Sequence, residues 1–578
     1  MKKLMLGNEA VARGFLEAGC KVVSSYPGTP STEITEYAAK YDEIYCEWAP
    51  NEKVAAEVAF GASLGGARAA CCMKHVGLNV AADPLFTLSY TGVNGGLVIC
   101  VADDPGMHSS QNEQDSRHYA EAAKIPMLEP SDSKEAKEFA KLAFSLSEKY
   151  DTPVLLRMCT RIAHSQCSVE LLEPETAEVK EYVKNPQKYI MAPANAIRRH
   201  PVVEKRTEDL IALAENCEFN FAEYAEDNSL GIITSGTAYQ YVKEIFGDSV
   251  SVLKLGLVYP LPVDLIKTLA SKVKRLVVIE ELDPFIENHC KALGLAVEGK
   301  SIFPICGELS QGIIAAALGL PENKFEASSD VIPVRPPVMC AGCPHRGLFY
   351  VLAKKKLTVL GDIGCYTLGS AAPLSAIDSV LCMGASVSGI HGFNKARGKD
   401  AEKRTVAVIG DSTFMHSGMT GLANIAYNNT ASTVIIVDNS ITGMTGHQHN
   451  PTTGYSIKGD PATKIDLEAL CRALGFNSVR VVDPADLKTT EAVIMEEINK
   501  DEPSVIISRR PCALLKSVKA KPALKVDPEK CRNCKACMKI GCPAISIKDG
   551  KAKIDATLCV GCDLCKQLCA FDAIGGEG

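Results

Sequence analysis

Eight cysteines between positions 531 and 569 constrain the end of this chain more than any other feature of its sequence. They form an internal repeat, CRNCKACMKIGCP and then CVGCDLCKQLCA, and each half separates its first three thiols by two residues. Three closely spaced thiolates wrap one iron–sulfur cubane, while a distant fourth thiolate crosses to the other cluster. The repeat therefore predicts two [4Fe-4S] clusters with crossed ligand sets: Cys531, Cys534, Cys537 and Cys569 for cluster one, and Cys559, Cys562, Cys565 and Cys542 for cluster two.

Two other chemistries also use closely spaced cysteines. Tetrahedral zinc suits CxxC pairs, but it has no use for a third cysteine at the same spacing in both halves. Disulfides are disfavoured in a reducing cytosol. Four residues separate Cys537 from Cys542, where three are usual, so the type of the cluster that uses Cys542 stays open.

The composition excludes several classes of protein. With 578 residues, the chain is long enough for about four domains of roughly 150 residues each. Hydrophobic residues make up 46%, and a net charge of −7 argues against nucleic acid as a partner. We find no signal peptide and no run of about 18 apolar residues, so we expect a cytoplasmic protein without a membrane partner.

Short runs rich in β-branched residues alternate with Ala- and Glu-rich segments along most of the chain. Such alternation predicts α/β domains with parallel sheets. We expect three of them, followed by a small α+β domain that holds the cysteine repeat. The predicted bounds are 1–190, a linker with a charged helix at 191–227, then 228–330, 335–515 and 520–578.

Two strands of the third α/β domain end in polar residues. Among the expected strands LTVLGDIG, SVLCMG, TVAVIGDS, TVIIVDNS and SVIISRR, the third ends at Asp411 and the fourth at Asn439. A right-handed crossover would place both tails at one sheet edge, where open α/β sheets bind ligands. Carboxylate and amide oxygens suit Mg²⁺ with a diphosphate, and Gly410, Gly418, Gly443 and Gly446 would let the backbone approach phosphates. Gly-Asp at a strand end is also common turn chemistry.

These residues resemble the magnesium–diphosphate motif of thiamine diphosphate enzymes, with Gly410-Asp411-Ser412 followed by Asp438-Asn439. A serine replaces the usual third glycine. The resemblance implies that Asp411, Asn439 and the carbonyl of Ile441 hold Mg²⁺, with Gly410, Ser412, Gly443 and Met444 also at the cofactor. Together with YPGTPS, NEKVAAEVAFGAS, CAGCPHR, GDIGC and the cysteine repeat, in this order, the whole chain resembles the 2-oxoacid:ferredoxin oxidoreductases.

The resemblance implies a fold and an activity. The first and third α/β domains would be of the thiamine diphosphate-binding type, the second similar to the transketolase C-terminal domain, and the last ferredoxin-like. The activity would be oxidative decarboxylation of a 2-oxoacid, with acyl transfer to coenzyme A and electrons passed to ferredoxin. The alternatives are another 2-oxoacid:ferredoxin oxidoreductase, a non-redox thiamine diphosphate decarboxylase, and an electron-transfer module whose α/β domains only bind a partner. A smaller beta subunit is expected as partner, in a dimer of heterodimers.

The resemblance also assigns residues in the first domain. Glu52, which by itself suits a helix-dipole partner, takes the place of the glutamate that contacts the aminopyrimidine ring, and Thr29 lies near substrate; Glu57 is a weaker candidate. Pyruvate-using members have an arginine where this chain reads VADDPGMHSS. That departure argues against pyruvate. It leaves the partner of the substrate carboxylate open among Lys74, His75 and Arg117. The phrases DNSITGMTGHQ and EELDPFIE resemble the arylpyruvate-using members of the family, which implies substrates such as indolepyruvate and phenylpyruvate.

A third cluster is the last expectation drawn from the resemblance. Family members often hold a cluster close to the cofactor, and this chain offers Cys340, Cys343, Cys365 and Cys512 in the corresponding places. Four thiolates from separated segments can ligate a cubane. Buried free cysteines are also common, so both readings of these four thiols stay open.

Overall fold

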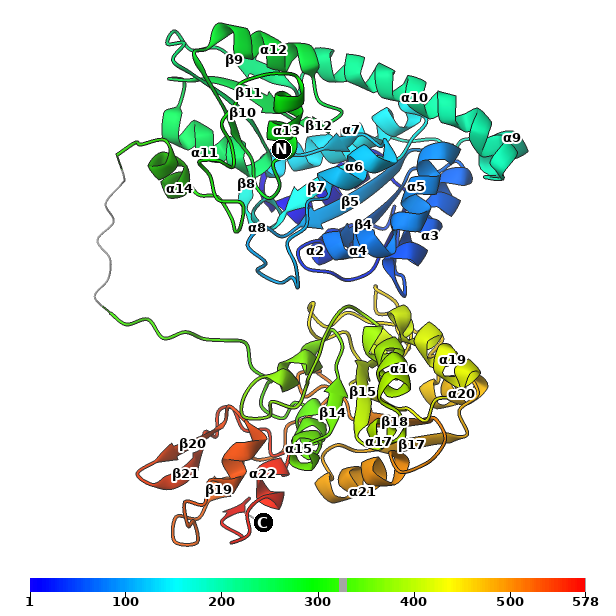
Figure 1. Cartoon of the computed structure of the whole chain (residues 1–578), viewed down its shortest axis with the longest axis vertical. Helices are drawn as coiled ribbons and strands as arrows, with labels where there is room; N and C mark the ends of the chain where they lie inside the picture. Colours follow the sequence, from blue (N-terminus) through cyan, green and yellow to red (C-terminus); the bar gives the residue numbers. More distant parts are fainter. Residues whose placement is uncertain (322–329, 577–578) are drawn as a thin grey trace. The chain divides into compact units, whose positions relative to one another are not determined.

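The computed structural model describes residues 1–321 and 330–576. The chain divides into two compact units, Met1–Ser328 and Ser329–Gly578 (Figure 1). The first unit contains the predicted domain 1–190 and the predicted domain 228–330 up to Ser328, and the second contains 335–515 and 520–578. Residues 322–329 of the predicted second domain and residues 577–578 of the predicted fourth lie outside the described residues.

The first unit is built on a seven-stranded sheet in the order β12-β6-β7-β5-β4-β2-β3. Every neighbouring pair is parallel except β12 with β6. Its central strands β4 and β5 are buried along their whole length, as parallel strands covered on both faces are. The strands are β2 (Val22–Ser25), β3 (Tyr45–Trp48), β4 (Ala69–Lys74), β5 (Leu97–Asp103), β6 (Met127–Leu128), β7 (Val154–Cys159) and β12 (Leu257–Tyr259).

Helices cover this sheet in two groups. In one group α7 packs on β5 and β7 and contacts α1, which contacts α2; in the other α3 packs on β2 and β4 and contacts α4 and α5. A two-stranded pair, β1 (Lys2–Leu6) with β8 (Gln166–Glu170), lies outside the sheet. The helices are α1 (Gly7–Glu17), α2 (Thr32–Ala38), α3 (Glu52–Leu64), α4 (His75–Val80), α5 (Ala82–Thr91), α6 (Arg117–Ala123), α7 (Ser133–Tyr150) and α8 (Thr160–His164).

A second, four-stranded sheet in the order β13-β10-β11-β9 completes the first unit. The predicted linker holds the charged helix α10, and it also supplies β9, which pairs with β11 before the predicted start of the domain at 228. The elements are α9 (Pro186–Tyr189), α10 (Pro193–Asn216), β9 (Phe221–Glu223), β10 (Leu230–Ser235), α11 (Gly236–Phe246), β11 (Ser251–Leu255), α12 (Val263–Lys272), β13 (Arg275–Ile279), α13 (Phe285–Ala292) and α14 (Gln311–Ala317).

The second unit contains a five-stranded parallel sheet in the order β14-β15-β16-β18-β17. The predicted strand SVLCMG is wrong: within it only Ser379 forms an isolated bridge, to Leu360, because the segment is largely exposed. The elements are α15 (His345–Lys355), β14 (Thr358–Leu360), η1 (Cys365–Ser370), α16 (Ala385–Arg397), α17 (Lys399–Glu402), β15 (Thr405–Gly410), α18 (Asp411–Thr413), η2 (Phe414–Gly418), α19 (Met419–Asn428), β16 (Thr433–Asp438), α20 (Leu467–Ala473), β17 (Ser478–Val482), α21 (Leu487–Glu497) and β18 (Ser504–Arg509).

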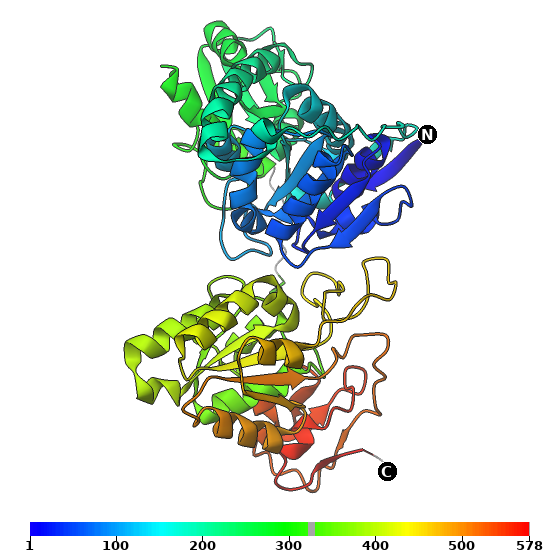
Figure 2. The ribbon, with the colours of Figure 1, turned by 90° about the vertical axis from the view of Figure 1, so that its right-hand side faces the viewer.

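The C-terminal segment, red in Figure 2, packs against the α/β part of the second unit. Buried residues of both parts, such as Leu348 and Leu564, belong to one hydrophobic core. The segment has two antiparallel pairs, β19 with β22 and β20 with β21. Its elements are β19 (Lys525–Val526), η3 (Ala536–Ile540), β20 (Ile545–Lys548), β21 (Lys551–Ile554), α22 (Leu564–Gln567) and β22 (Ile574–Gly575).

Parallel α/β architecture is thus confirmed in both units. The ferredoxin-like character of the C-terminal segment stays a prediction. Within the described ranges, no helix combines the length and the apolar character that crossing a membrane requires.

Candidate functional site

Asp411 and Asn439 meet at the carboxyl edge of the five-stranded sheet. Strands β15 and β16 pair in parallel with Gly410 opposite Val437, so the residues that follow the two strands come out side by side. The runs TVAVIG and TVIIVD are buried throughout, which fixes both strands in the core. Asp411 is 3% exposed and Asn439 6% exposed. The crossover predicted from the sequence therefore brings these two side chains together.

Three oxygen-bearing groups converge at this edge. The side-chain amide of Asn439 lies 2.7 Å from the carbonyl oxygen of Ile441 and 3.3 Å from Oδ1 of Asp411, and its nitrogen donates a hydrogen bond to both. Turning this amide over would place its oxygen beside the other two and give three acceptors around one point. Carboxylate, amide and backbone carbonyl are the hard ligands that Mg²⁺ takes. The donor set therefore fits the predicted magnesium site.

The charge on Asp411 supports the same assignment. Burial, and next the nearby carboxylate of Asp438, raise the pKa of Asp411 to about 7. Thr452 donates a hydrogen bond from its hydroxyl to Oδ2 of Asp411 at 3.2 Å, which offsets only part of this cost. A bound cation would favour the charged form and reverse the shift. Sequence reasoning missed Thr452, although it lies in the turn-forming run NPTTG.

The other residues expected at the cofactor differ in their surroundings. Ser412 is 6% exposed in the turn after β15, and Met444 is half exposed. At Gly410, an added Cβ would lie 2.7 Å from the ring of Tyr366, so this glycine makes room for an aromatic side chain. Gly418 packs in the same way against Phe414. Contact of these residues with phosphates stays a prediction.

Four thiols from three separated segments gather close to this edge. They are those of Cys340, Cys343, Cys365 and Cys512. Burial raises the pKa of Cys343 to about 12 and that of Cys365 to about 11. Neighbouring thiols of the same group raise both pKa values further, Cys365 and Cys340 acting on Cys343, and Cys512 and Cys340 acting on Cys365. This mutual influence on the pKa values indicates that the four thiols lie near one another.

The segment after Asn439 connects the two groups. The backbone N–H of Cys512 donates to the carbonyl oxygen of Asn439 at 3.0 Å. A Cβ added at Gly443 would lie 3.4 Å from the sulfur of Cys365, and Nε2 of His447 lies 3.8 Å from the sulfur of Cys512. The oxygens around Asp411 and the four thiols are thus linked through one short stretch of backbone. Nothing in the sequence pattern pointed to His447.

The cysteine repeat lines two separate cavities in the C-terminal segment. The first is lined by Cys531, Cys534, Cys537 and Cys569 and encloses about 370 Å³, including space open to solvent. The second is lined by Cys542, Cys559, Cys562 and Cys565 and encloses about 290 Å³ on the same basis. These are the crossed sets that the spacing predicts. Cys537 lies near enough to Cys565 to help raise its pKa, so the two cavities are neighbours.

The second cavity also touches the segment that carries Cys340 and Cys343. Ala341 and Gly342 line it, and a Cβ at Gly342 would lie 2.2 Å from the side chain of Val560. Arg346 links the α/β part to the C-terminal segment, because its guanidinium donates to the carbonyl oxygens of Cys340 and Ile540, each at 3.0 Å. The four thiols near Asp411, the second cavity and the first cavity therefore follow one another through the second unit.

Glu52 lies at the carboxyl edge of the seven-stranded sheet in the first unit. It opens helix α3 directly after Asn51, whose side chain accepts from the backbone N–H of Val54. Glu52 is 5% exposed, and a Cβ at Gly77 would lie 2.6 Å from its carboxyl group. Glu57, one turn later, is half exposed and pairs with Lys53 at 3.9 Å. The surroundings thus favour Glu52 over Glu57 for a role inside a site.

Thr29 and Lys74 lie at the same sheet edge. Thr29 is half buried in the loop after β2, next to a cis peptide bond to Pro30. A Cβ at Gly28, in this loop, would lie 3.1 Å from the Cβ of Lys74. The ammonium group of Lys74 is buried and donates to the carbonyl oxygen of Ser109. Burial lowers the pKa of Lys74 to about 8, which the carboxylate of Asp104 only partly opposes.

His75 and Arg117 differ from Lys74 as candidates for the substrate carboxylate. His75 is fully buried, with Nε2 3.1 Å from the side-chain oxygen of Asn112. Arg117 is 1% exposed and its donors are already used: it binds Asp115 through Nε and Nη2, and Glu280 through Nη1 at 2.6 Å. Arg117 is therefore a structural ion-pair partner, and Lys74 is the better candidate.

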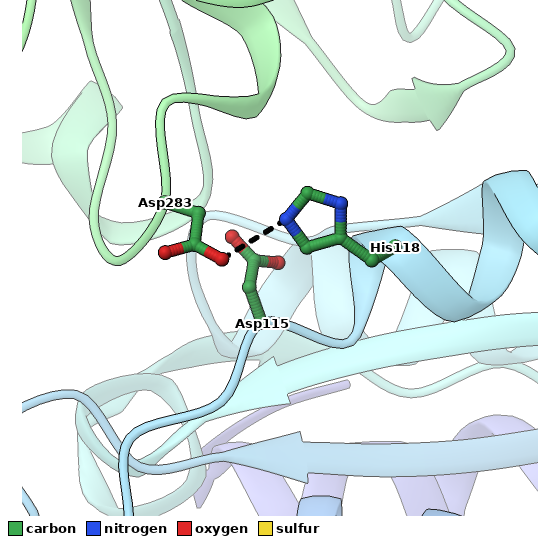
Figure 3. A group of neighbouring side chains, drawn as sticks. All are labelled: Asp115, His118 and Asp283. Atoms are coloured by element: carbon green, nitrogen blue, oxygen red, sulfur yellow. Dashed lines mark hydrogen bonds and ion pairs between the residues drawn. The ribbon is translucent and has the colours of Figure 1, made fainter.

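Figure 3 shows the outer side of this ion-pair cluster, where Asp115, His118 and Asp283 approach one another. Nε2 of His118 lies 3.0 Å from the carboxylate of Asp283. Ligand atoms of the three residues lie within 4.8 Å of one another, a spacing that could hold a metal ion. The carboxylate of Asp115 is already neutralised by Arg117, however, and its pKa is held well below its usual range. The group is therefore a salt-bridge cluster that joins α6 to the turn after β13.

Two family models match the two parts of the chain that carry these groups. Residues 13–225 match the thiamine diphosphate-binding domain of pyruvate flavodoxin/ferredoxin oxidoreductases. Residues 362–508 match the C-terminal, thiamine pyrophosphate-binding domain of thiamine pyrophosphate enzymes. Glu52 and Lys74 fall in the first match, and Asp411 and Asn439 fall in the second. The fold and these matches define an oxidoreductase of the thiamine diphosphate-dependent class.

Three curated relatives narrow the class. The chain is 42% identical to an indolepyruvate oxidoreductase subunit IorA of Archaeoglobus fulgidus, over 99% of the chain and 97% of the relative. It is 40% identical to the subunit of the same name from Methanothermobacter thermautotrophicus, over 100% and 98%. A 2-oxoglutarate synthase subunit KorA of A. fulgidus is 24% identical over 52% of the chain and 96% of the relative. The chain belongs to the family of indolepyruvate oxidoreductase subunits IorA.

Proposed function

We propose that this protein catalyses the oxidative decarboxylation of arylpyruvates, with transfer of the acyl group to coenzyme A and of electrons to ferredoxin. Indolepyruvate is a proposed substrate in keeping with the name of the relatives that match the whole chain. Phenylpyruvate is the second substrate that we propose. Two [4Fe-4S] clusters at the cysteine repeat, and a third cluster at the four thiols near Asp411, would carry the electrons. A cytoplasmic location belongs to the same proposal.

The observation that carries this proposal is the link between the Asp411 edge and the four thiols of Cys340, Cys343, Cys365 and Cys512. One backbone segment supplies Asn439 to the first group and contacts Cys512 of the second, at 3.0 Å between backbone atoms. A decarboxylase without redox chemistry would have no use for thiols packed against its diphosphate site. An enzyme that removes electrons from the bound intermediate needs a redox centre at that place.

The chain's own residues would divide the work at the cofactor. Thiamine diphosphate, when bound, supplies the carbanion chemistry of decarboxylation. Asp411, Asn439 and the carbonyl of Ile441 would hold Mg²⁺ against the diphosphate, with Gly410, Ser412, Gly443 and Met444 around it. Glu52 would exchange a proton with the aminopyrimidine ring. Its burial favours such a role, because a carboxyl group shielded from water keeps its hydrogen bond.

Lys74 would bind the carboxylate of the 2-oxoacid, with Thr29 at the neighbouring position. Its ammonium group has the carbonyl oxygen of Ser109 as hydrogen-bond acceptor, and its aliphatic stem lies beside the loop that carries Thr29. A buried ammonium gains strongly from an incoming anion, because the pair replaces lost hydration.

The assembly that we propose contains a second, smaller subunit. The relatives are named as subunits of an oxidoreductase, which implies a partner chain. A dimer of heterodimers, each with an alpha and a beta chain, is the arrangement that we propose. Coenzyme A would bind within this assembly.

An anaerobic assay with the smaller subunit present tests the proposal. Indolepyruvate, phenylpyruvate and pyruvate are compared with coenzyme A and either ferredoxin or a viologen dye as acceptor. We expect acceptor reduction coupled to formation of the aryl-acetyl thioester, with the aryl substrates at least about tenfold better in kcat/KM, since one well-filled apolar pocket discriminates by 1–3 kcal/mol. Aldehyde released without acceptor reduction would identify a non-redox decarboxylase. Equal kcat/KM for pyruvate would refute the aryl preference.

A further inference from the structure

The rim of the first cysteine cavity is cationic. Among the residues that line this cavity, the charged side chains are Arg532 and Lys535, and both are exposed. They flank Cys534, the exposed member of the four thiols. In the part of the chain that the structure describes, no ion pair neutralises Arg532 or Lys535. Phe571, which is 45% exposed, adds an apolar side chain to the same rim.

The second cysteine cavity has the opposite character. Its lining contains no charged side chain among the described residues, and Ala341 and Gly342 of the α/β part cover one side of it. The two cavities are therefore not equivalent, although the sequence repeat makes them look so. Charged side chains stand at the first cavity, and none lines the second among the described residues.

The charge of the segment contrasts with that of the whole chain. Residues 520–578 contain ten Lys and Arg against seven Asp and Glu, a net charge of +3, whereas the whole chain carries −7. A locally cationic surface on an anionic protein attracts an anionic partner to one place and repels it elsewhere. The contrast selects a partner by charge and also fixes where the partner approaches.

We propose that the rim formed by Arg532, Lys535 and Phe571 is the docking surface for a small acidic protein that accepts one electron at a time. This inference rests on the proposed function, because it requires a cluster within the first cavity. Cationic side chains would steer the acidic carrier, and Phe571 would give an apolar contact at the centre. Cys534 would be the ligand closest to the carrier, so the electron leaves at the exposed end of the cluster.

The test compares two acceptors of opposite charge in the complete enzyme, with its smaller subunit. Variant R532E/K535E is measured with a purified acidic 2[4Fe-4S] ferredoxin and with methyl viologen, which is a cation. We expect KM for the ferredoxin to rise at least about tenfold, because charges at a docking rim act mainly on the association rate. The rate with methyl viologen should be unchanged or higher. Added salt should slow the unmodified enzyme with ferredoxin and have little effect on the variant.

The control is K267E/K488E, which makes the same charge change at exposed lysines elsewhere in the chain. An unchanged ferredoxin KM in R532E/K535E, or an equal rise in the control, would overturn the docking surface. Loss of the smaller subunit from R532E/K535E would also overturn it, since the rim would then bind that subunit. If charge reversal lowers iron content, the neutral variant R532Q/K535Q takes its place with the same expected direction. Failure of the proposed function shows separately, as an unmodified enzyme that reduces neither acceptor.

Discussion

A carboxylate buried as deeply as that of Asp411 is costly unless positive charge accompanies it. The neighbouring carboxylate of Asp438 makes the cost larger, although Arg509 pairs with Asp438 at 2.8 Å and confines its charge. The charged carboxylate of Asp411 is therefore unfavourable at this position unless a cation lies beside it. Such a position is typical of a functional site, because no gain in stability explains it.

Replacing Asp411 by asparagine tests its role as a magnesium ligand. The amide keeps the size of the side chain but loses the charge, so we expect the affinity for Mg²⁺ with thiamine diphosphate to fall at least about a hundredfold. The measurement is the cofactor retained after gel filtration at a series of Mg²⁺ concentrations. Asp460→Asn is the control, at an exposed residue of the loop that follows Asn439. Unchanged Mg²⁺-dependent retention in Asp411→Asn would show that the ligand assignment is wrong.

Lys74 gives a prediction about pH. Its pKa is lowered to about 8 by burial, so the ammonium is charged below that pH and loses its charge above it. Since the substrate carboxylate stays anionic, affinity should be highest below pH 8, and KM should rise by up to about tenfold per pH unit above it. A plot of KM against pH, with kcat measured in parallel, checks this expectation.

The variant Lys74→Met separates this role from a general effect on structure. Loss of a charge-assisted hydrogen bond of about 1.5–3 kcal/mol should raise KM at pH 7 by roughly 10- to 150-fold and remove its dependence on pH near 8. Lys53→Met, which removes an exposed ion pair in the same unit, should leave KM unchanged. A Lys74→Met enzyme with normal KM would eliminate this residue as the partner of the carboxylate.

At the scale of elements, the loop between β16 and α20 is the most informative part of the second unit. It spans residues 439–466 without a helix or strand of its own, apart from isolated bridges such as Thr442 with Gln448. Loops of this length in a compact domain usually carry function. This one contacts Asp411 through Thr452 and the thiol of Cys512 through His447. Its conformation is set by the site that it forms, so periodicity could not have predicted it.

The four thiols beside this loop yield a prediction about iron. If Cys340, Cys343, Cys365 and Cys512 hold a cubane, the reconstituted enzyme should contain about twelve iron atoms, and Cys365→Ser should lower this by about four. Cys382→Ser is the matched control, because Cys382 is an exposed cysteine a short distance along the chain. Iron analysis with electron paramagnetic resonance of the reduced protein gives the answer. Equal iron content in the two variants would mean that these four are free thiols.

Strands were predictable from sequence where burial and propensity agree. TVAVIG and TVIIVD are apolar, β-branched and buried, and they form β15 and β16. SVLCMG has the same propensity, but Leu381 is 75% exposed, and no strand forms there. The run SVLKLGLVYP reads as one strand and forms two, β11 and β12, in different sheets. The break falls at Gly256, where an added Cβ would lie 2.6 Å from the backbone of Phe219. Phe219 is distant in sequence, so no local pattern could have predicted this break.

The candidate site was predictable in its parts but not in its connections. Cysteine spacing gave the two sets that line the C-terminal cavities, and the strand ends gave Asp411 and Asn439. The backbone hydrogen bond from Cys512 to Asn439 joins residues more than seventy positions apart, and no local pattern encodes it. A carboxylate that occupies one of the hydrogen-bond donors of Arg117 also comes from a distant part of the chain, because Glu280 directly follows β13 of the second sheet.

At the scale of the whole molecule, Arg117 shows why the two predicted N-terminal domains behave as one unit. Its guanidinium joins α6 of the first sheet to the end of β13 in the second, and strand β12 crosses from one predicted domain into the sheet of the other. A buried arginine between two buried carboxylates cannot be removed without leaving unpaired charge. We therefore expect that the boundary suggested by the sequence at 191–227 does not separate two independently stable parts.

Arg117→Met should destabilise the first unit by about 3–5 kcal/mol, because Asp115 and Glu280 would stay buried without their partner. Arg161→Met is the control: it breaks an exposed ion pair, to Glu308, across the same two domains and should cost less than about 1 kcal/mol. Urea denaturation measures the difference in the free energy of unfolding. Hydrogen exchange measures amide protection separately in the two predicted N-terminal domains. Both parts should lose protection together in Arg117→Met, since one ion-pair cluster supports them.

Equal stability of the two variants, or loss of protection in only one part, would contradict a shared unit. At low temperature, where the variant stays folded, an unchanged KM for the 2-oxoacid would separate this structural role from substrate binding.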